Sequence, residues 1–292
     1  MSPTLRGMGW MMLSGIIFIT LNTALRELSL TINPFEVQCL RYAAGIFVML
    51  PFIARTGLSA WKPASGWWGQ VRRGMVHTTS LLLWFTALPH IQIADVTAIS
   101  FTTPIFVMIG AVIFLGEKMI WERWVAALVG FVGVLVVVGG GLAGSGGKYT
   151  LLMLASSPMA ACSYLISKAL TRHDKPSVIV AWQSITVALL SLPFALLDWT
   201  WPSLHQWGLF LGCGVLGSTG HYCLTRAFVA ADISATQPAR FFDLVWSTSA
   251  GWIAFHEFPT KSTMLGAAII FGGTTWLAQR ERKIRMADSR SL

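Results

Sequence analysis

The chain has 292 residues, of which 54% are hydrophobic and only 11% charged, and its mean hydropathy is +0.64. Because soluble domains are about 25% charged, this composition excludes an ordinary soluble domain and favours a chain that lies in a bilayer. The net charge of +9 does not indicate nucleic-acid binding, because the basic residues sit in short loops and the C-terminal tail and form no basic face with stacking aromatics.

Ten apolar stretches follow one another along the chain, each close to the roughly 20 residues that a spanning helix needs. In chain order they are 8–25, 35–54, 69–88, 93–115, 121–140, 150–168, 177–197, 206–228, 233–256 and 263–279. The first is too long for a signal peptide and lacks a clear cleavage site, so we expect an uncleaved span. Hydrocarbon offers no partner to free backbone groups, so the spans are predicted to be helices and the chain an all-α integral membrane protein.

Arg41, Arg226 and Arg240 fall within spans, and the other lysines and arginines divide unevenly between the two sides of the predicted membrane. Fifteen of them, Arg73 included, fall on the side that holds both termini, and three fall on the opposite side. An excess of this kind marks the cytoplasmic side. Both termini are therefore predicted to be cytoplasmic.

The stretch 81–137 is echoed by 221–277 at a constant offset of 140 residues. Eight pairs are identical across the offset: Ala87/Ala227, Ile93/Ile233, Phe101/Phe241, Ile113/Ile253, Glu117/Glu257, Ala127/Ala267, Phe131/Phe271 and Gly133/Gly273. Both copies also show two apolar spans joined at a glutamate. A fixed-period echo predicts structural repeats.

Each half of the chain contains five predicted spans, and an odd number makes the two halves enter the membrane from opposite sides. This is the inverted-repeat plan of many secondary transporters, whose substrate site lies at the repeat interface near the midplane. We expect a first repeat over 1–140, a Gly-rich linker over 141–149, a second repeat over 150–279 and a basic cytoplasmic tail over 280–292.

Arg240 and Asp243, in the ninth predicted span, are the strongest candidates for function, because ionisable groups inside a span are costly. At i, i+3 on a helix the two are neighbours and can pair. One interpretation is an internal ion pair that only makes a buried charge tolerable. In the other, Arg240 binds a substrate carboxylate, and Asp243 is its resting partner or contacts an amine.

Further candidates lie in the third and eighth predicted spans. The spacing of His77, Ser80 and Trp84 places these three side chains on one face, and His221 lies in the corresponding span of the second half. A lone intramembrane histidine is more often a packed, hydrogen-bonded residue than a ligand or a proton relay. Both interpretations stay open for His77 and His221.

Trp84, Tyr164, Tyr222 and Trp246 are candidates for an aromatic wall, which suits an apolar side chain or a cationic amine. Packing between neighbouring helices explains each ring equally well. Asn22 and Gln38, in the first two predicted spans, are candidates for additional polar contacts.

Pro104, Pro158 and Pro238 lie inside predicted spans, where a proline removes a backbone hydrogen bond and bends a helix. Such bends suit moving gates, although rigid bundles contain them too. Glu117 and Glu257 are predicted to be structural groups at helix ends, with a capping or interface role.

The Leu115-Gly116-Glu117 sequence, the Gly-rich span that follows it and a second copy ending at His256-Glu257 resemble the EamA-type repeat of the drug/metabolite transporter superfamily. The segment 240–244 resembles the corresponding part of amino-acid exporters of the YddG type. The resemblance implies ten helices around a central cavity lined by the first four helices of each half. The chain departs from the pattern at His256, where glycine is usual, and at Leu244, where Pro104 would repeat.

The sequence therefore predicts a secondary transporter that works by alternating access and exports small metabolites, most of all amino acids including aromatic and large neutral ones. The alternatives are an exporter of drugs or other metabolites, a nucleotide-sugar transporter, which has thin support, and a non-transporting intramembrane enzyme or receptor. No Walker A, HExxH or GxSxG motif occurs, and no cofactor or metal site is expected.

The predicted partners are a small-molecule substrate and the lipid bilayer, and the predicted location is a bacterial-type inner membrane. A homodimer stays open. The choice between proton coupling and facilitated diffusion also stays open.

Overall fold

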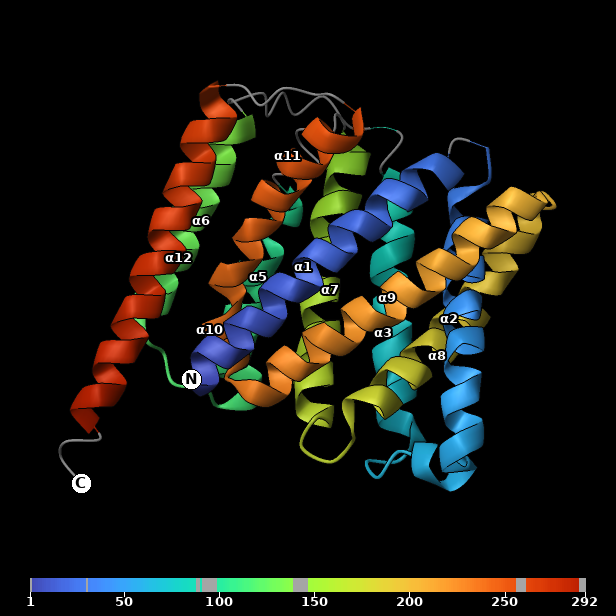
Figure 1. The fold of residues 1–292 in the computed structure, drawn as a ribbon, viewed down its shortest axis with the longest axis horizontal. Helices are drawn as coiled ribbons and strands as arrows, with labels where there is room; N and C mark the ends of the chain where they lie inside the picture. Colours follow the sequence, from blue (N-terminus) through green and yellow to red (C-terminus); the bar gives the residue numbers. More distant parts are fainter. Residues whose placement is uncertain are drawn as a thin grey trace.

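The computed structural model describes residues 2–29, 31–87, 90, 99–138, 147–255 and 261–288, and all regular structure in these ranges is helical (Figure 1). The helices are α1 (Pro3–Leu28), α2 (Pro34–Thr56), α3 (Trp67–Ala87), α5 (Thr103–Leu115), α6 (Trp121–Val138), α7 (Lys148–Leu170), α8 (Pro176–Ala195), α9 (Leu204–Ala230), α10 (Ile233–Thr236), α11 (Phe242–Phe255) and α12 (Lys261–Asp288). Short 3₁₀ segments are η1 (Leu58–Trp61), η3 (Leu196–Asp198) and η4 (Gln237–Phe241). Each predicted span contains helix, so the all-α prediction is confirmed for these ranges.

Four helical segments in the described ranges are long and apolar enough to cross a membrane: Pro3–Leu25, Pro34–Thr56, Lys148–Leu170 and Pro176–Asp198. The segment Thr103–Leu115 is apolar but shorter. Length and composition alone thus support four of the predicted spans, and the other spans stay a prediction.

Local sequence signals explain where several helices begin. Proline stands in the first turn of α1, α2 and α8, where its missing N–H costs nothing. The side chains of Ser2 and Asn33 accept from backbone N–H groups at the starts of α1 and α2. Ser203 and Gln206 form a complete capping box at the start of α9. Gly116, with φ of 68°, ends α5 in the left-handed conformation that glycine adopts freely.

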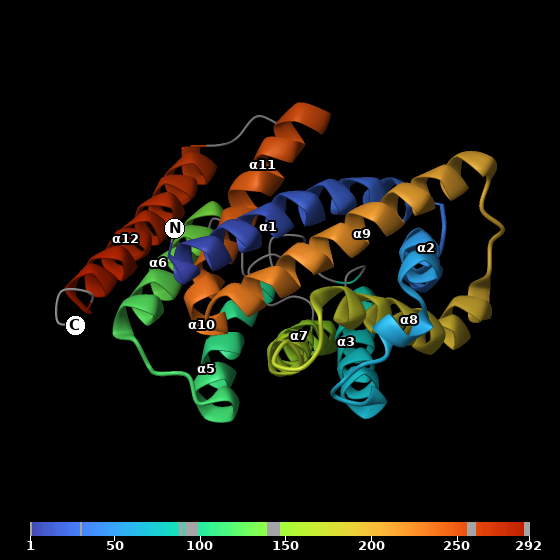
Figure 2. The same cartoon turned by 60° about the horizontal axis from the view of Figure 1, so that its bottom comes forward.

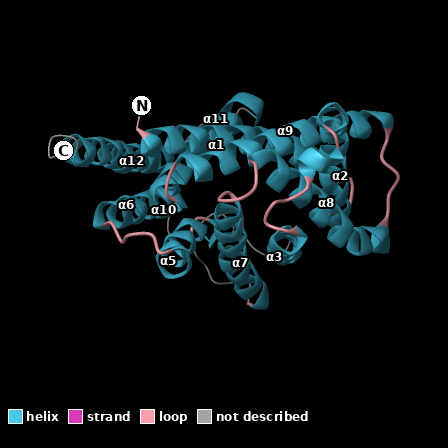
Figure 3. Ribbon diagram, turned by 90° about the horizontal axis from the view of Figure 1, so that it is seen from below, coloured by secondary structure: helices cyan, strands magenta, loops and turns pink. Residues whose placement is uncertain are grey.

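The helices of the two halves interdigitate. Helix α1 packs against α9 and α11, and α7 packs in the same way against α3 and α5. Helix α2 packs against α9, and its counterpart α8 packs against α3. Two helices also pack against their own counterparts: α2 against α8, and α6 against α12. Exchanging each helix with its counterpart in the other half therefore reproduces the main contacts. Figures 2 and 3 show α6 with α12 at one edge of the molecule and α2 with α8 at the opposite edge.

Two glycines at the 140-residue offset make matching close contacts between helices. A Cβ on Gly74 of α3 would lie 2.1 Å from Oγ1 of Thr186 in α8, and a Cβ on Gly214 of α9 would lie 2.7 Å from the carbonyl carbon of Ala44 in α2. Gly133 and Gly273 play the corresponding part between α6 and α12, where each faces side chains of the other helix. The repeated Gly133/Gly273 pair therefore belongs to the packing between these two helices.

The connections between α2 and α3, between α5 and α6, and between α7 and α8 lie toward the end of the bundle that also holds both termini (Figure 1). Helix α12 continues to Asp288, so residues 280–288 of the predicted tail are helical. Helix α7 begins at Lys148, inside the predicted linker, whose residues 141–146 lie outside the described ranges.

The three candidate hinge prolines differ in their effect on the backbone. Pro104 stands in the first turn of α5, and the helical residues 99–100 before it are separated from α5 by a turn at 101–102. Pro158 lies within α7, which continues on both sides of it. Pro238 lies in η4, where regular α-helix gives way between α10 and α11. Regular helix is therefore interrupted just before Pro104 and at Pro238, whereas Pro158 lies within a continuous helix.

The close α9–α2 contact predicts a specific sensitivity to added volume. We expect Gly214→Ala to lower the stability of the protein by about 1–3 kcal/mol, because the new methyl group overpacks a helix crossing. The measurement is the midpoint of thermal unfolding in detergent. Gly212→Ala is the matched control, because Gly212 lies on the same helix and a Cβ there would meet no atom within 4 Å. Equal midpoints for the two variants would contradict the proposed contact.

Candidate functional site

The interruption at η4 places an ion pair inside the bundle. Arg240 is in η4 and Asp243 in the first turn of α11, and Nε of the arginine lies 3.9 Å from Oδ2 of the aspartate. The predicted i, i+3 pair is thus present. Their side chains are 21% and 23% exposed, whereas Ile233 and Phe241 in the same segment are fully buried. The two charged groups therefore keep accessible surface within an otherwise buried segment.

Two other helices contribute to the surroundings of this pair. The guanidinium carbon of Arg240 lies 5.0 Å from the ring centroid of Tyr164 in α7, which is a cation–π contact. In α1, a Cβ on Gly15 would lie 2.1 Å from Oδ1 of Asp243 and 3.4 Å from Cδ1 of Trp246. Gly15 therefore makes room for the aspartate. Helices α1, α7 and α11 meet around an arginine, a carboxylate and two aromatic rings.

A second polar group joins the two candidate histidines. The hydroxyl of Tyr42 in α2 lies 3.1 Å from Nε2 of His77 in α3 and 3.3 Å from Nε2 of His221 in α9. Gln183 in α8 donates from Nε2 to Nε2 of His221 over 3.2 Å. These four side chains are all buried. A single tyrosine hydroxyl thus links helices of both halves.

Arg73 extends this network and corrects the sequence analysis, which counted it among the charges of the cytoplasmic side. It is 1% exposed in α3. Its guanidinium donates to the backbone carbonyl of Ile179 over 3.0 Å and to Oε1 of Gln183 over 2.5 Å. Arg73 lies one turn before His77, so its +4 spacing to a candidate histidine was the signal that could have identified it.

Tyr42 and Gln183 were also missed by the sequence analysis. Tyr42 lies one helical turn after the candidate Gln38, and Gln183 stands opposite Arg41 at the offset of 142 that relates the second spans of the two halves. Neither signal distinguishes these residues from ordinary polar residues in a span. Only the crossing of α2 with α8 and α9 brings them together.

One face of α1 connects the ion pair with the histidine network. Gly15 faces Asp243, and the ring of Phe18, nearly one turn later, contacts His221 edge-on at 4.8 Å between centroids. Asn22 lies seven residues after Gly15 and therefore on the same face. Its side chain is exposed, and it lies outside the buried network.

Two predicted polar residues tie helices together. Ser80 donates its hydroxyl to the carbonyl of Ser156 in α7 over 2.8 Å, and Gln38 donates to Oγ of Ser191 in α8 over 2.7 Å. Both side chains are buried. Their observed contacts are those of helix packing.

The four predicted aromatic rings pack against four different apolar clusters. Tyr164 and Trp246 lie beside the ion pair, as described above. Trp84 packs with Ala87 and Met153, and Tyr222 packs in a different apolar cluster and contacts Nη1 of Arg226 through its hydroxyl. Of the four rings, Tyr164 and Trp246 are thus the two that lie beside the ion pair, and a wall of all four stays a prediction.

The interior carries more positive than negative charge around these groups. Arg73 is buried, and the half-buried Arg41 lies over the Tyr42 ring at 4.3 Å. Within the part of the chain that the structure describes, neither has a carboxylate within ion-pair distance. Burying a cation without a counter-charge is costly. This arrangement favours a ligand that brings a carboxylate.

The model of the EamA-like transporter family matches residues 5–139 and 147–279. An S-adenosylmethionine uptake transporter of Rickettsia bellii is 31% identical over 277 residues, covering 95% of this chain and 94% of that protein. A riboflavin transporter of Vibrio cholerae is 30% identical over 285 residues, covering 96% and 95%. The pseudopaline exporter CntI of Pseudomonas aeruginosa is 26% identical over 259 residues, covering 88% and 90%.

A solved crystal structure superposes on this chain with a TM-score of 0.78 at 21% sequence identity. The alignment covers 93% of this chain and 95% of the other. At this identity the likeness shows the fold alone.

The tyrosine bridge predicts a stability effect. We expect Tyr42→Phe to lower the unfolding free energy by about 1–3 kcal/mol, because the buried nitrogens that contact the hydroxyl lose a partner. Thermal unfolding in detergent measures this loss. Tyr149→Phe is the control, since the Tyr149 ring stacks on His90 and its hydroxyl has no described hydrogen bond. An unchanged midpoint for Tyr42→Phe would show that the bridge contributes little.

Proposed function

We propose that this chain, which belongs to the EamA-like transporter family, carries a small metabolite with an α-amino-acid head group and a flat ring. The family and the similar proteins are transporters, so the intramembrane enzyme left open by the sequence is excluded. The chain is a membrane protein with apolar helices.

One observation carries the proposal: Arg240 and Asp243 are paired, partly exposed and flanked by aromatic rings. An arginine binds a carboxylate through a fork of donors, and an aspartate binds an ammonium. An α-amino acid carries both groups on one carbon. On binding, such a head group exchanges one weak ion pair for two contacts, while Tyr164 and Trp246 offer ring faces to the rest of the molecule.

The substrates of similar proteins help to narrow the class. S-adenosylmethionine has an α-amino-acid group and an adenine ring, as this site requires, and aromatic amino acids have the same two parts. Riboflavin has a flat ring system but neither a carboxylate nor an ammonium. We therefore place S-adenosylmethionine and aromatic amino acids ahead of riboflavin as substrates of this chain.

Export stays a prediction. The similar proteins include an uptake transporter and an exporter, so the family does not fix the direction. Both termini are proposed to be cytoplasmic, in the inner membrane of a bacterium. Coupling to protons and transport down a gradient are both compatible with this site.

Alternating access between two inverted five-helix repeats is the proposed mechanism. The exchange of helix contacts between the halves supports this plan, because a pseudo-two-fold axis relates inverted repeats. The break at η4 supports it as well, since interrupted helices of this kind line substrate sites in transporters. In this mechanism the Arg240–Asp243 pair lies at the interface between the two repeats, which move relative to each other.

Counterflow in proteoliposomes tests the substrate class. Vesicles loaded with unlabelled substrate are expected to accumulate labelled S-adenosylmethionine or labelled phenylalanine, and not labelled riboflavin. Empty vesicles without protein provide the background. Exchange of riboflavin alone would overturn the amino-acid head group as the recognised feature.

Substitution of Arg240 tests its assigned role. We expect Arg240→Ala to weaken the apparent affinity for the exchanged probe by about 10- to 100-fold, the equivalent of a charge-assisted contact of about 1.5–3 kcal/mol. Arg240→Lys keeps the charge but not the fork and is expected to lose less. Both are measured at matched protein levels in the vesicles, with the exposed Arg172→Ala as control. Full affinity in both Arg240 variants would remove the arginine from the site.

A further inference from the structure

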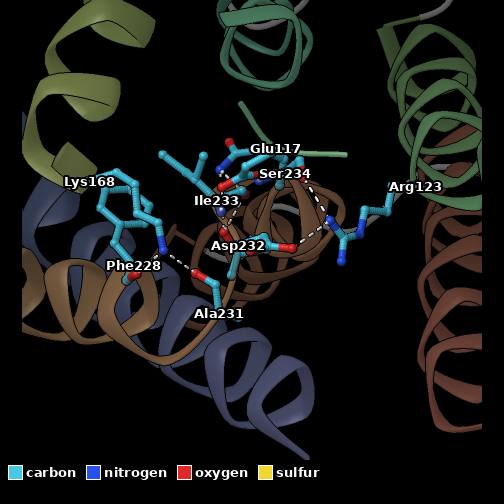
Figure 4. Close-up of polar contacts among 10 residues, drawn as sticks. Glu117, Arg123, Lys168, Phe228, Ala231, Asp232, Ile233 and Ser234 are labelled. Carbon is cyan, nitrogen blue, oxygen red and sulfur yellow. Dashed lines mark hydrogen bonds and ion pairs between the residues drawn. The ribbon is translucent and has the colours of Figure 1, made fainter. Parts of the chain in front are cut away.

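The corner between α9 and α10 is held by side chains from other parts of the chain (Figure 4). At the end of α9, Lys168 of α7 donates from Nζ to the carbonyl of Phe228 over 2.5 Å and to that of Ala231 over 2.6 Å. These carbonyls belong to the end of a helix, where intrahelical partners run out. The ammonium group of Lys168 thus replaces the backbone N–H donors that are missing at the end of the helix.

At the start of α10, a carboxylate accepts hydrogen bonds from backbone N–H groups that have no partner within the helix. Glu117, which follows α5, accepts from the backbone N–H of Ile233 over 2.7 Å and from that of Ser234 over 3.1 Å. The hydroxyl of Ser234 donates to the same carboxylate over 2.6 Å. The predicted end-of-helix role of Glu117 is confirmed, and the helix it caps belongs to the other half of the chain. Glu257 lies outside the described residues.

A third charged residue completes the arrangement. Nη1 of Arg123, in the first turn of α6, lies 3.1 Å from Oδ2 of Asp232 and 2.9 Å from Oγ of Ser234. Glu117, Arg123 and Lys168 thus all contact residues 228–234. A cavity of about 510 Å³ adjoins the corner and is lined by Glu117, Lys168 and Asp232 among others. The corner therefore has open space beside it into which it can shift.

The corner leads directly to the arginine of the proposed site. Helix α10 has four residues and passes without a loop into η4, which contains Arg240. A helix of a single turn has no stability of its own, because nucleation is unfavourable. Its position therefore depends on its ends and on what packs against it. Glu117 fixes the only end that is not continuous with η4.

We propose that Glu117 is a positioning residue for Arg240, acting through the capped N-terminus of α10; this inference rests on the proposed function. With the cap in place, the one-turn helix holds η4 at a fixed depth and directs the guanidinium toward the carboxylate of the substrate. Without it, α10 shifts toward the adjoining cavity and Arg240 loses its alignment. The effect is confined to substrates that carry a carboxylate.

The experiment compares a probe with and without its carboxylate in the full-length protein. S-adenosylmethionine and decarboxylated S-adenosylmethionine, or phenylalanine and phenethylamine, compete for counterflow in proteoliposomes. The measured quantity is a ratio, the half-inhibitory concentration of the decarboxylated probe divided by that of the probe with its carboxylate. In the unmodified protein we expect the carboxylate to lower that concentration by about tenfold or more, the equivalent of one charge-assisted contact.

Glu117→Gln is the central variant, because it is nearly isosteric but presents an NH₂ donor where the carboxylate accepted. We expect the ratio to fall about threefold or more, while the concentration for the decarboxylated probe and the maximal rate change by less than about twofold. Glu117→Asp keeps the charge on a shorter side chain, and an intermediate ratio is expected. The matched control is Lys118→Gln, which removes a neighbouring exposed charge beside the same cavity.

The outcomes separate the two levels of the proposal. If the ratio collapses in Arg240→Ala but stays unchanged in Glu117→Gln and Glu117→Asp, the positioning role is overturned and the substrate class stands. If Arg240→Ala also leaves the ratio unchanged, the proposed function itself fails. A merely structural Glu117 would lower the amount of folded protein or the rate for both probes alike and leave the ratio intact, which also overturns the inference. Should Glu117→Gln fail to fold, Glu117→Asp alone decides between these outcomes.

Discussion

Backbone groups at an interrupted helix need partners, and this requirement organises the candidate site. Between α9 and α11 the chain turns a corner, forms one helical turn and then a 3₁₀ segment. Freed N–H and C=O groups that are withdrawn from water need hydrogen-bond partners. Glu117 and Lys168 satisfy them at the corner. Charged side chains thereby stabilise the break, and the segment that follows it carries Arg240 and Asp243.

The packing residues recur in both halves of the chain, whereas the polar residues of the candidate site do not. Gly74 and Gly214 make equivalent close crossings, and Ala87 and Ala227 are both fully buried. The polar groups do not repeat: Ser100 stands opposite Arg240, and Leu81 opposite His221. Two halves that share their packing but not their polar residues can pivot alike while binding an asymmetric molecule. Substrate recognition then resides in what one copy has and the other lacks.

Helix α1 is the element that couples the two polar groups. It contacts Asp243 through Gly15 and His221 through Phe18, so a shift of α1 is felt by both. The buried Arg73 and the half-buried Arg41, which have no described ion-pair partner, add an electrostatic preference for an anionic group nearby. A family that includes transporters of chemically different metabolites is consistent with a common packing scheme and a small set of exchangeable polar residues.

The sequence by itself determined the features that depend on neighbours along the chain. Apolar stretches of spanning length predicted the helices, the i, i+3 spacing predicted the Arg240–Asp243 pair, and the glutamate between two apolar spans predicted a helix-end role for Glu117. Tertiary structure alone decided which residues meet across the bundle. Tyr42 and His221 are 179 positions apart, and Arg73 and Gln183 are 110 apart. Their contacts follow from the angles at which whole helices cross, and those angles are set by packing surfaces on several helices at once, which no local pattern encodes.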